Sequence, residues 1–170
     1  MPGASPNLQP PVGRLRSYAL MALGALAAGV LGAVFDQLTV SLSPEYFTLG
    51  KGASADVPLR LSAAAIGFRG GLPIGALFAG GLLWLRRRGA RVHLLPQLAR
   101  AAAAAMLSCL VCAMGMVAID PFGVRPDASG VLTPSGATRF LACWGIHIGA
   151  YVGPMLSLGA AVRRAAASPT

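Results

Sequence analysis

The sequence predicts an all-α integral membrane protein in which four transmembrane helices form an antiparallel bundle. Of its 170 residues, 55% are hydrophobic and only 11% are charged, and the mean hydropathy of +0.67 lies above the range of soluble globular domains. The apolar residues gather into four runs, each of about 18 to 25 residues, the length that crosses a bilayer core. The net charge of +9 would suggest nucleic acid in a soluble protein, but the basic residues stand at the ends of the apolar runs. We therefore expect a lipid bilayer as the partner and no nucleic acid.

The first apolar run, 18–37, follows a stretch, 1–17, that contains four prolines and two arginines and is expected to be a disordered cytoplasmic tail. A cleaved signal peptide is the alternative interpretation, because Leu31-Gly32-Ala33 offers a small-residue cleavage site. The run is longer than the apolar core of a usual signal peptide, and small residues recur along it at every fourth position. A retained transmembrane helix is therefore favoured.

The remaining runs complete a single domain, 18–162. The link between the second and third helices is short, so these two helices should form an antiparallel hairpin. Ser43-Pro44-Glu45 predicts the start of a short helix, with serine as the cap and proline in the first helical position. The predicted segments are helices at 62–85, 100–119 and 139–162, outer loops at 38–61 and 120–138, an inner loop at 86–99 and a cytoplasmic tail at 163–170.

The charges divide between the two ends of the predicted helices. All five acids fall on one side, and nine arginines without any acid fall on the other. By the positive-inside rule the arginine-rich side is cytoplasmic, so both termini are expected there. The heavy use of arginine, alanine, glycine and leucine suggests a GC-rich bacterial coding bias and hence a bacterial inner membrane. The nine residues are Arg14, Arg16, Arg86, Arg87, Arg88, Arg91, Arg100, Arg163 and Arg164.

Polar residues at a shared depth predict a cluster at the outer boundary of the membrane. Counted along each helix from its cytoplasmic end, four groups lie within about 6 Å of one another in depth: Asp36, Arg69, Asp120 and His147. Charged groups inside a membrane segment usually face the bundle interior and pair, so we expect Asp36 to pair with Arg69. We also expect the turn at Pro44 to carry Glu45 back over the bundle. The alternative is that Arg69 snorkels to the headgroups while His147 only bonds across helices. The predicted cluster comprises Asp36, Gln37, Glu45, Tyr46, Arg69, His147 and Tyr151.

Small residues and cysteines suggest packing roles. Glycines at four-residue spacing predict faces on which helices approach closely, either within the chain or against a membrane-protein partner or a second copy. Cys109 and Cys112 form a CxxC without a basic neighbour, so these two and Cys143, one turn before His147, are expected to act as packing residues. The glycines of these faces are Gly24, Gly32, Gly67, Gly71, Gly145, Gly149 and Gly153.

One stretch carries a family resemblance. Asp36-Gln37-Leu38-Thr39-Val40, followed by Pro44-Glu45-Tyr46-Phe47-Thr48, resembles the D-Q-x-T … E-Y-F-T signature of a group of small uncharacterised bacterial multi-pass membrane proteins. In that group the signature also follows the first membrane helix, and a His with a Tyr four residues later in the last helix is similar to His147 and Tyr151. Arg69-Gly70-Gly71 stands where the group has a tryptophan-containing segment. The resemblance implies a fold and a membrane location, and it implies no activity.

Three classes of function are compatible with these features. The favoured class is a structural or accessory subunit that packs through its small-residue faces. The second is a protein that handles a small molecule, a proton or an ion at the outward-facing polar cluster. The third is an outward-facing membrane enzyme that uses Asp36, Glu45 and His147 as acid, base or metal ligands. We expect a non-enzyme, because the sequence carries no recognised catalytic, cofactor or metal motif.

Overall fold

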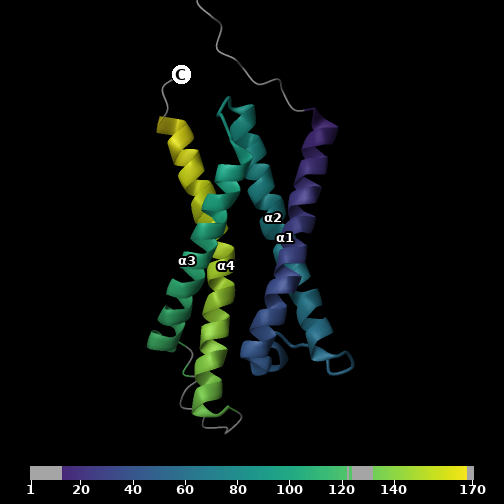
Figure 1. The fold of residues 1–170 in the computed structure, drawn as a ribbon, viewed down its shortest axis with the longest axis vertical. Coiled ribbons are helices and arrows are strands. Elements are labelled where there is room, and N and C mark those ends of the chain that lie inside the picture. The colour runs from purple at the N-terminus through teal and green to yellow at the C-terminus, as the bar shows by residue number, and fades with distance from the viewer. Residues whose placement is uncertain (1–12, 122, 124–131, 168–170) are drawn as a thin grey trace, which may run out of the picture.

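The computed structural model describes residues 13–121, 123 and 132–167, and within these ranges it is helical and contains no strand (Figure 1). Four helices are long and apolar enough to cross a membrane, as the sequence predicts. A short π-helical segment, η1, lies between the first two. The elements are α1 (Arg14–Leu42), η1 (Tyr46–Gly50), α2 (Leu59–Arg87), α3 (Leu94–Ile119) and α4 (Pro134–Ala167).

The helices extend beyond the apolar runs that predict them. α1 begins at Arg14, inside the expected tail, and continues to Leu42, inside the expected outer loop. α3 begins at Leu94 within the expected inner loop, and α4 runs through the expected C-terminal tail to Ala167. Hydropathy marks only the part of a helix that suits hydrocarbon, whereas the backbone hydrogen bonds continue into polar sequence. Residues 1–12 of the predicted N-terminal tail, 122 and 124–131 of the second outer loop, and 168–170 lie outside the described residues.

The four helices pair as two hairpins. α1 packs along α2 and α3 packs along α4, while the two pairs touch each other mainly through α2 and α4. Figure 1 shows α1 with α2 on one side of the molecule and α3 with α4 on the other. The expected hairpin of the second and third helices is therefore wrong. A short link permits such a hairpin, but the faces that allow close approach lie on α1 with α2 and on α3 with α4.

Glycines bring the backbones of α1 and α2 together. A Cβ on Gly32 would overlap the backbone of Gly67, and a Cβ on Gly71 would overlap the backbone of Ala28. Gly24 meets Gly75 further along, so the two helices run in opposite directions. In lipid, this close packing of small residues supplies much of the attraction between helices.

Close packing at glycines also joins α3 and α4, which confirms the prediction that the fourth helix packs through its glycines. Gly145 faces the backbone of Ala113, Gly149 that of Cys109, and Gly153 that of Ala105. All seven glycines named from the sequence thus contact other helices of this chain. These faces therefore pack within the chain, which is one of the two alternatives predicted, and a membrane-protein partner or a second copy stays a prediction.

The two ends of the molecule differ in charge. The start of α1, the α2–α3 turn and the end of α4 lie together at the top of Figure 1, and we call this the arginine end because it carries the nine arginines named above. The opposite end, which we call the η1 end, holds η1 and the starts of α2 and α4. Arg87 and Arg88 are among the arginines of this end that contact other side chains. Arg87 Nη2 donates to Ser17 Oγ at 3.1 Å, and the Arg88 guanidinium lies 4.6 Å from the centre of the Trp84 ring.

Candidate functional site

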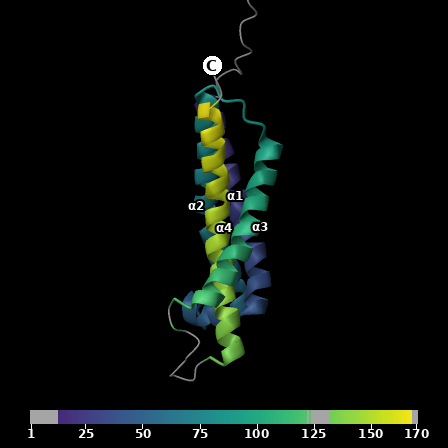
Figure 2. The same cartoon turned by 90° about the vertical axis from the view of Figure 1, so that its left-hand side faces the viewer.

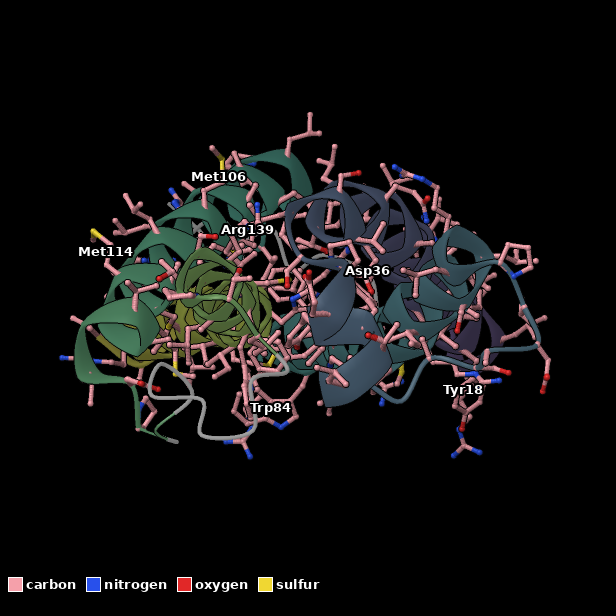
Figure 3. All side chains as sticks on the ribbon, turned by 90° about the horizontal axis from the view of Figure 1, so that it is seen from below. Tyr18, Asp36, Trp84, Met106, Met114 and Arg139 are labelled. Atoms are coloured by element: carbon pink, nitrogen blue, oxygen red, sulfur yellow. The ribbon has the colours of Figure 1, made fainter. Side chains whose placement is uncertain are left out.

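A buried pair of side chains links the two hairpins towards the η1 end. Asp36 of α1 places its Oδ1 atom 2.9 Å from Nε2 of His147 on α4. The exposed fractions of the two residues are 2% and 4%. Figure 3 looks at the molecule from this end: Asp36 lies among the helices, whereas Met106 and Met114 point outward from the rim. The pair therefore lies where one hairpin meets the other.

Both ring nitrogens of His147 are engaged, which limits where the protons can be. Nδ1 lies 2.8 Å from the backbone carbonyl oxygen of Cys143. A carbonyl oxygen only accepts, so Nδ1 must carry a hydrogen and donate it. One further proton lies between Nε2 and the Asp36 carboxyl group, either on the imidazole as a charged pair or on the carboxyl group as a neutral pair. Both forms have zero net charge, which suits a buried position.

The second carboxyl oxygen of Asp36 favours the neutral form. Oδ2 is buried, and no donor among the residues that the structure describes reaches it. The carboxyl group lies against α2, where a Cβ on Gly67 would come within 2.8 Å of Asp36 Cγ. A negatively charged oxygen without a donor is costly in such a place, whereas a neutral carbonyl oxygen tolerates the lack of a donor better. We therefore assign the shared proton to Asp36, which donates it to Nε2 of His147.

Aromatic rings enclose the imidazole of His147. The ring of Tyr46 lies over it, with the centroids 4.8 Å apart and the planes at 34°. Phe47 and Phe35 meet it edge-on, at centroid distances of 5.9 Å and 6.0 Å. Tyr46 and Phe47 both belong to η1 and are themselves buried. The η1 segment thus covers the imidazole.

The local sequence explains why the chain turns back here. Ser43 is extended, as expected for a residue that precedes proline, and this ends α1. Its Oγ accepts a hydrogen bond from the Tyr46 backbone N–H at 3.3 Å and donates to Glu45 Oε2 at 3.2 Å. The predicted helix start at Ser43-Pro44-Glu45 is confirmed. The π-helical turn that follows, a form often found at functional sites, brings Tyr46 and Phe47 over His147.

Arg69 does not belong to the cluster, and the expected Asp36–Arg69 pair is wrong. The Arg69 side chain is exposed on α2, whereas Gly67 faces Asp36. Two positions along a helix differ by about 200°, so Gly67 and Arg69 point in nearly opposite directions. The depth counted from the arginines correctly put Asp36 and His147 at the same level of the membrane. Arg69, however, lies on the side of α2 that faces away from Asp36, so His147 is the partner of Asp36.

The remaining predicted members lie at different distances from the pair. Gln37 faces away, and its Nε2 donates to the backbone carbonyl of Arg60 at 2.9 Å. Glu45 does not fold back over the bundle, because Ser43 holds its carboxylate at the start of the turn. Tyr151, one turn beyond His147 on α4, is half-buried and its hydroxyl lies against Gly70 of α2. Of the seven residues, Asp36, Tyr46 and His147 form the site, and Tyr151 borders it.

Three contributors were missed from the sequence: the Cys143 carbonyl oxygen, Phe35 and Phe47. The carbonyl oxygen had a signal, because Cys143 lies one turn before His147. Phe35 and Phe47 stand beside predicted site residues but read as parts of apolar sequence. Cys143 Sγ also lies 3.9 Å from Nδ1 of His147, consistent with the packing role expected of the cysteines.

The comparisons with protein-family models, with curated proteins and with solved structures find no match for this chain. The resemblance to the D-Q-x-T … E-Y-F-T group therefore stays a prediction, and the chemistry of the site rests on its geometry.

The site offers proton exchange more readily than other chemistry. In the described part of the chain, no three His, Cys, Asp or Glu residues gather in a way that could hold a metal ion. Burial raises the pKa of the Tyr46 phenol, so that this ring stays neutral above the pair. A substrate would have to displace Tyr46 and Phe47 to reach His147. A proton needs far less room.

Proposed function

We propose that the protein is a multi-pass protein of a bacterial cytoplasmic membrane that takes up and releases a proton at the Asp36–His147 pair. The observation that carries this proposal is the 2.9 Å contact between two buried titratable groups, Asp36 Oδ1 and His147 Nε2, beside a carboxyl oxygen that no donor of the described residues reaches. A further proton would give the pair a net positive charge, and loss of the shared one would leave it negative. Either change costs free energy in apolar surroundings and weakens the link between the hairpins.

The orientation follows from the arginine end. We place this end, with both termini, in the cytoplasm, because nine arginines without an acid favour that side. Asp36 lies 20 residues beyond Arg16 (36 − 16), which is about 30 Å along a helix that rises about 1.5 Å per residue. A bilayer core is about 30 Å thick, so the pair would lie near its outer boundary. Protons would then reach it from outside, past η1.

The other two classes of function have less support. An accessory-subunit role was expected to rest on the glycine faces, which are filled by helices of the same chain. An enzyme would need Glu45 near His147, but Ser43 holds Glu45 and aromatic rings cover the imidazole. Proton exchange requires only that η1 move enough to admit water.

An infrared pH titration of the full chain in lipid tests the proposal. Between about pH 4 and about pH 9, which spans the usual range of carboxyl and imidazole groups, we expect a carboxyl C=O band that changes with pH. The band should disappear in Asp36→Asn. It should persist in Asp120→Asn, a matched control, since Asp120 has a positive φ of 43° that asparagine also tolerates. An Asp36 band that stays constant across the whole range would contradict proton exchange.

A further inference from the structure

A second candidate site lies at the arginine end, between α3 and α4. A groove of about 270 Å³ opens there, and each of the two helices contributes one arginine to it. In Figure 2, α3 and α4 diverge towards this end. The residues that line the groove are Arg100, Ala104, Leu156, Ser157, Ala160 and Arg164.

The polarity of the groove changes along its length. On each helix the arginine, Arg100 or Arg164, lies nearer the arginine end than the apolar lining residues of that helix. Ala104 and Ala160 lie one turn further towards the middle of the molecule, and Leu156 lies one turn beyond Ala160. The Gly149–Cys109 and Gly153–Ala105 contacts, continued along both helices, put Arg100 level with Leu158, so the two arginines differ in depth by about 9 Å and their side chains, which lean towards the N-terminus of each helix, lean towards each other. Beyond Arg100 the lining consists of Ala104 and Leu156, with Ser157 as its polar member. A molecule that fits it has an anionic head and a hydrocarbon chain.

The two helices are fixed to each other beside the groove. Gln97 of α3 is buried, and its Nε2 donates to both the backbone oxygen and the Oγ of Ser157 on α4, each at 3.2 Å. These bonds lie one turn from Arg100 along α3 and two turns from Arg164 along α4. They hold the helices that carry the two arginines at a set separation, as a preorganised site requires.

We propose that this groove binds an anionic phospholipid of the cytoplasmic leaflet. The phosphate lies between Arg100 and Arg164, whose guanidinium groups match the geometry of phosphate oxygens, and an acyl chain lies along Ala104, Leu156 and Ala160. Basic pockets between membrane helices on the cytoplasmic side are suited to such headgroups. The assignment to the cytoplasmic leaflet rests on the orientation proposed above. Lipid binding itself does not depend on the Asp36–His147 pair, which lies at the other end of the molecule.

Lipid binding is measured on the full chain in detergent, as the rise in the thermal unfolding midpoint during a titration. The probes are phosphatidylglycerol, phosphatidylcholine with the same acyl chains, and glycerol 3-phosphate as a soluble phosphate. We expect phosphatidylglycerol to stabilise the protein at the lowest concentration and glycerol 3-phosphate to have no effect. The double variant Arg100→Gln/Arg164→Gln should bind phosphatidylglycerol about thirtyfold more weakly, about fivefold for each arginine.

A matched control removes the same charge elsewhere at the same end. Arg91→Gln/Arg163→Gln should keep its affinity within about threefold, because both residues are exposed and neither lines the groove. Ala160→Trp keeps both arginines and fills the groove, so it should lose binding as the first double variant does. If that double variant does not fold, Ala160→Trp decides.

Three results would overturn the assignment. Equal loss in the Arg91/Arg163 control would mean that binding follows net charge and not the groove. Unchanged phosphatidylglycerol binding by Ala160→Trp would mean that no acyl chain lies there. The same stabilisation by glycerol 3-phosphate would make a soluble phosphate, and not a lipid, the ligand.

Discussion

Replacing Asp36 tests where the shared proton lies. If Asp36 donates to Nε2 of His147, then Asp36→Asn retains a donor, because the side-chain amide can take the place of the carboxyl hydrogen. Asp36→Ala removes the donor and leaves Nε2 buried without a partner. An unsatisfied buried group costs about 1 to 3 kcal/mol, and the loss of packing adds to this. We expect a loss of about 2 to 4 kcal/mol in Asp36→Ala and less than about 1 kcal/mol in Asp36→Asn.

The assay is unfolding of the full chain by sodium dodecyl sulfate in mixed micelles, followed by circular dichroism. Asp56→Ala is the control, since Asp56 is exposed and substitutions of this kind change the free energy of unfolding by within about 0.5 kcal/mol. If Asp36→Asn destabilises as strongly as Asp36→Ala, the pair is charged and the proton belongs to His147, which refutes the assignment made from Oδ2.

A double-mutant cycle then tests the contact itself. Asp36→Ala and His147→Ala should each be destabilising, and together they should lose less than the sum by about 1 to 3 kcal/mol, the usual coupling of buried hydrogen-bonded partners. Effects that add to within about 0.5 kcal/mol would show that the two side chains do not interact.

Three further outcomes are expected. Gly149→Leu should destabilise the protein by at least about 3 kcal/mol in the same assay, because its side chain would overlap the backbone of Cys109. Gly115→Leu, the control, should be neutral or stabilising, because a Cβ there meets nothing within 4 Å. Equal effects of the two substitutions would contradict the packing. Since burial raises the pKa of Tyr46, the folded state prefers the neutral phenol, so this contribution to stability is complete below about pH 10 and is lost as the pH rises further. The loss of stability at high pH should be smaller in Tyr46→Phe. Identical pH profiles of unfolding for the two proteins would rule the effect out. A reporter that is active only outside the cytoplasm tests the orientation. We expect activity when it is fused at Gly52 or Ser129 and none when it is fused at Thr170. Activity at Thr170, or silence at Gly52, would reverse the proposed orientation.

The helices were predictable from the sequence because membrane spans are encoded in composition. Each apolar run appears as a helix, and the distance from the arginines placed Asp36 and His147 at one level. The pairing of helices was less accessible, since a short link between α2 and α3 allows a hairpin but does not enforce one. Small-residue faces decide the pairing, and they are visible in the sequence without their partners.

The depth of the site in the membrane was predictable from the sequence, but the directions in which its side chains point around each helix were not. Whether Asp36 meets Arg69 or His147 depends on how α2 and α4 are rotated about their own axes. Side chains two positions apart on a helix point in directions that differ by about 200°, so a small error in rotation changes the partner. The π-helical turn had no sequence signal beyond the start at Ser43-Pro44-Glu45. It brings aromatic rings, and not Glu45, over His147. Local hydrogen bonding of Ser43 set that outcome.

The division into two hairpins has a consequence during synthesis. His147 follows Asp36 by 111 residues, so at about 5 to 20 residues per second a ribosome needs roughly 6 to 22 s to add it after Asp36. The first hairpin can close in the bilayer during that interval, with the Asp36 side chain against Gly67 and no imidazole near it. A carboxyl group that keeps its own proton can wait there at little cost, as an ionised one could not. The proton that later joins the two halves is then already in place when the second half arrives.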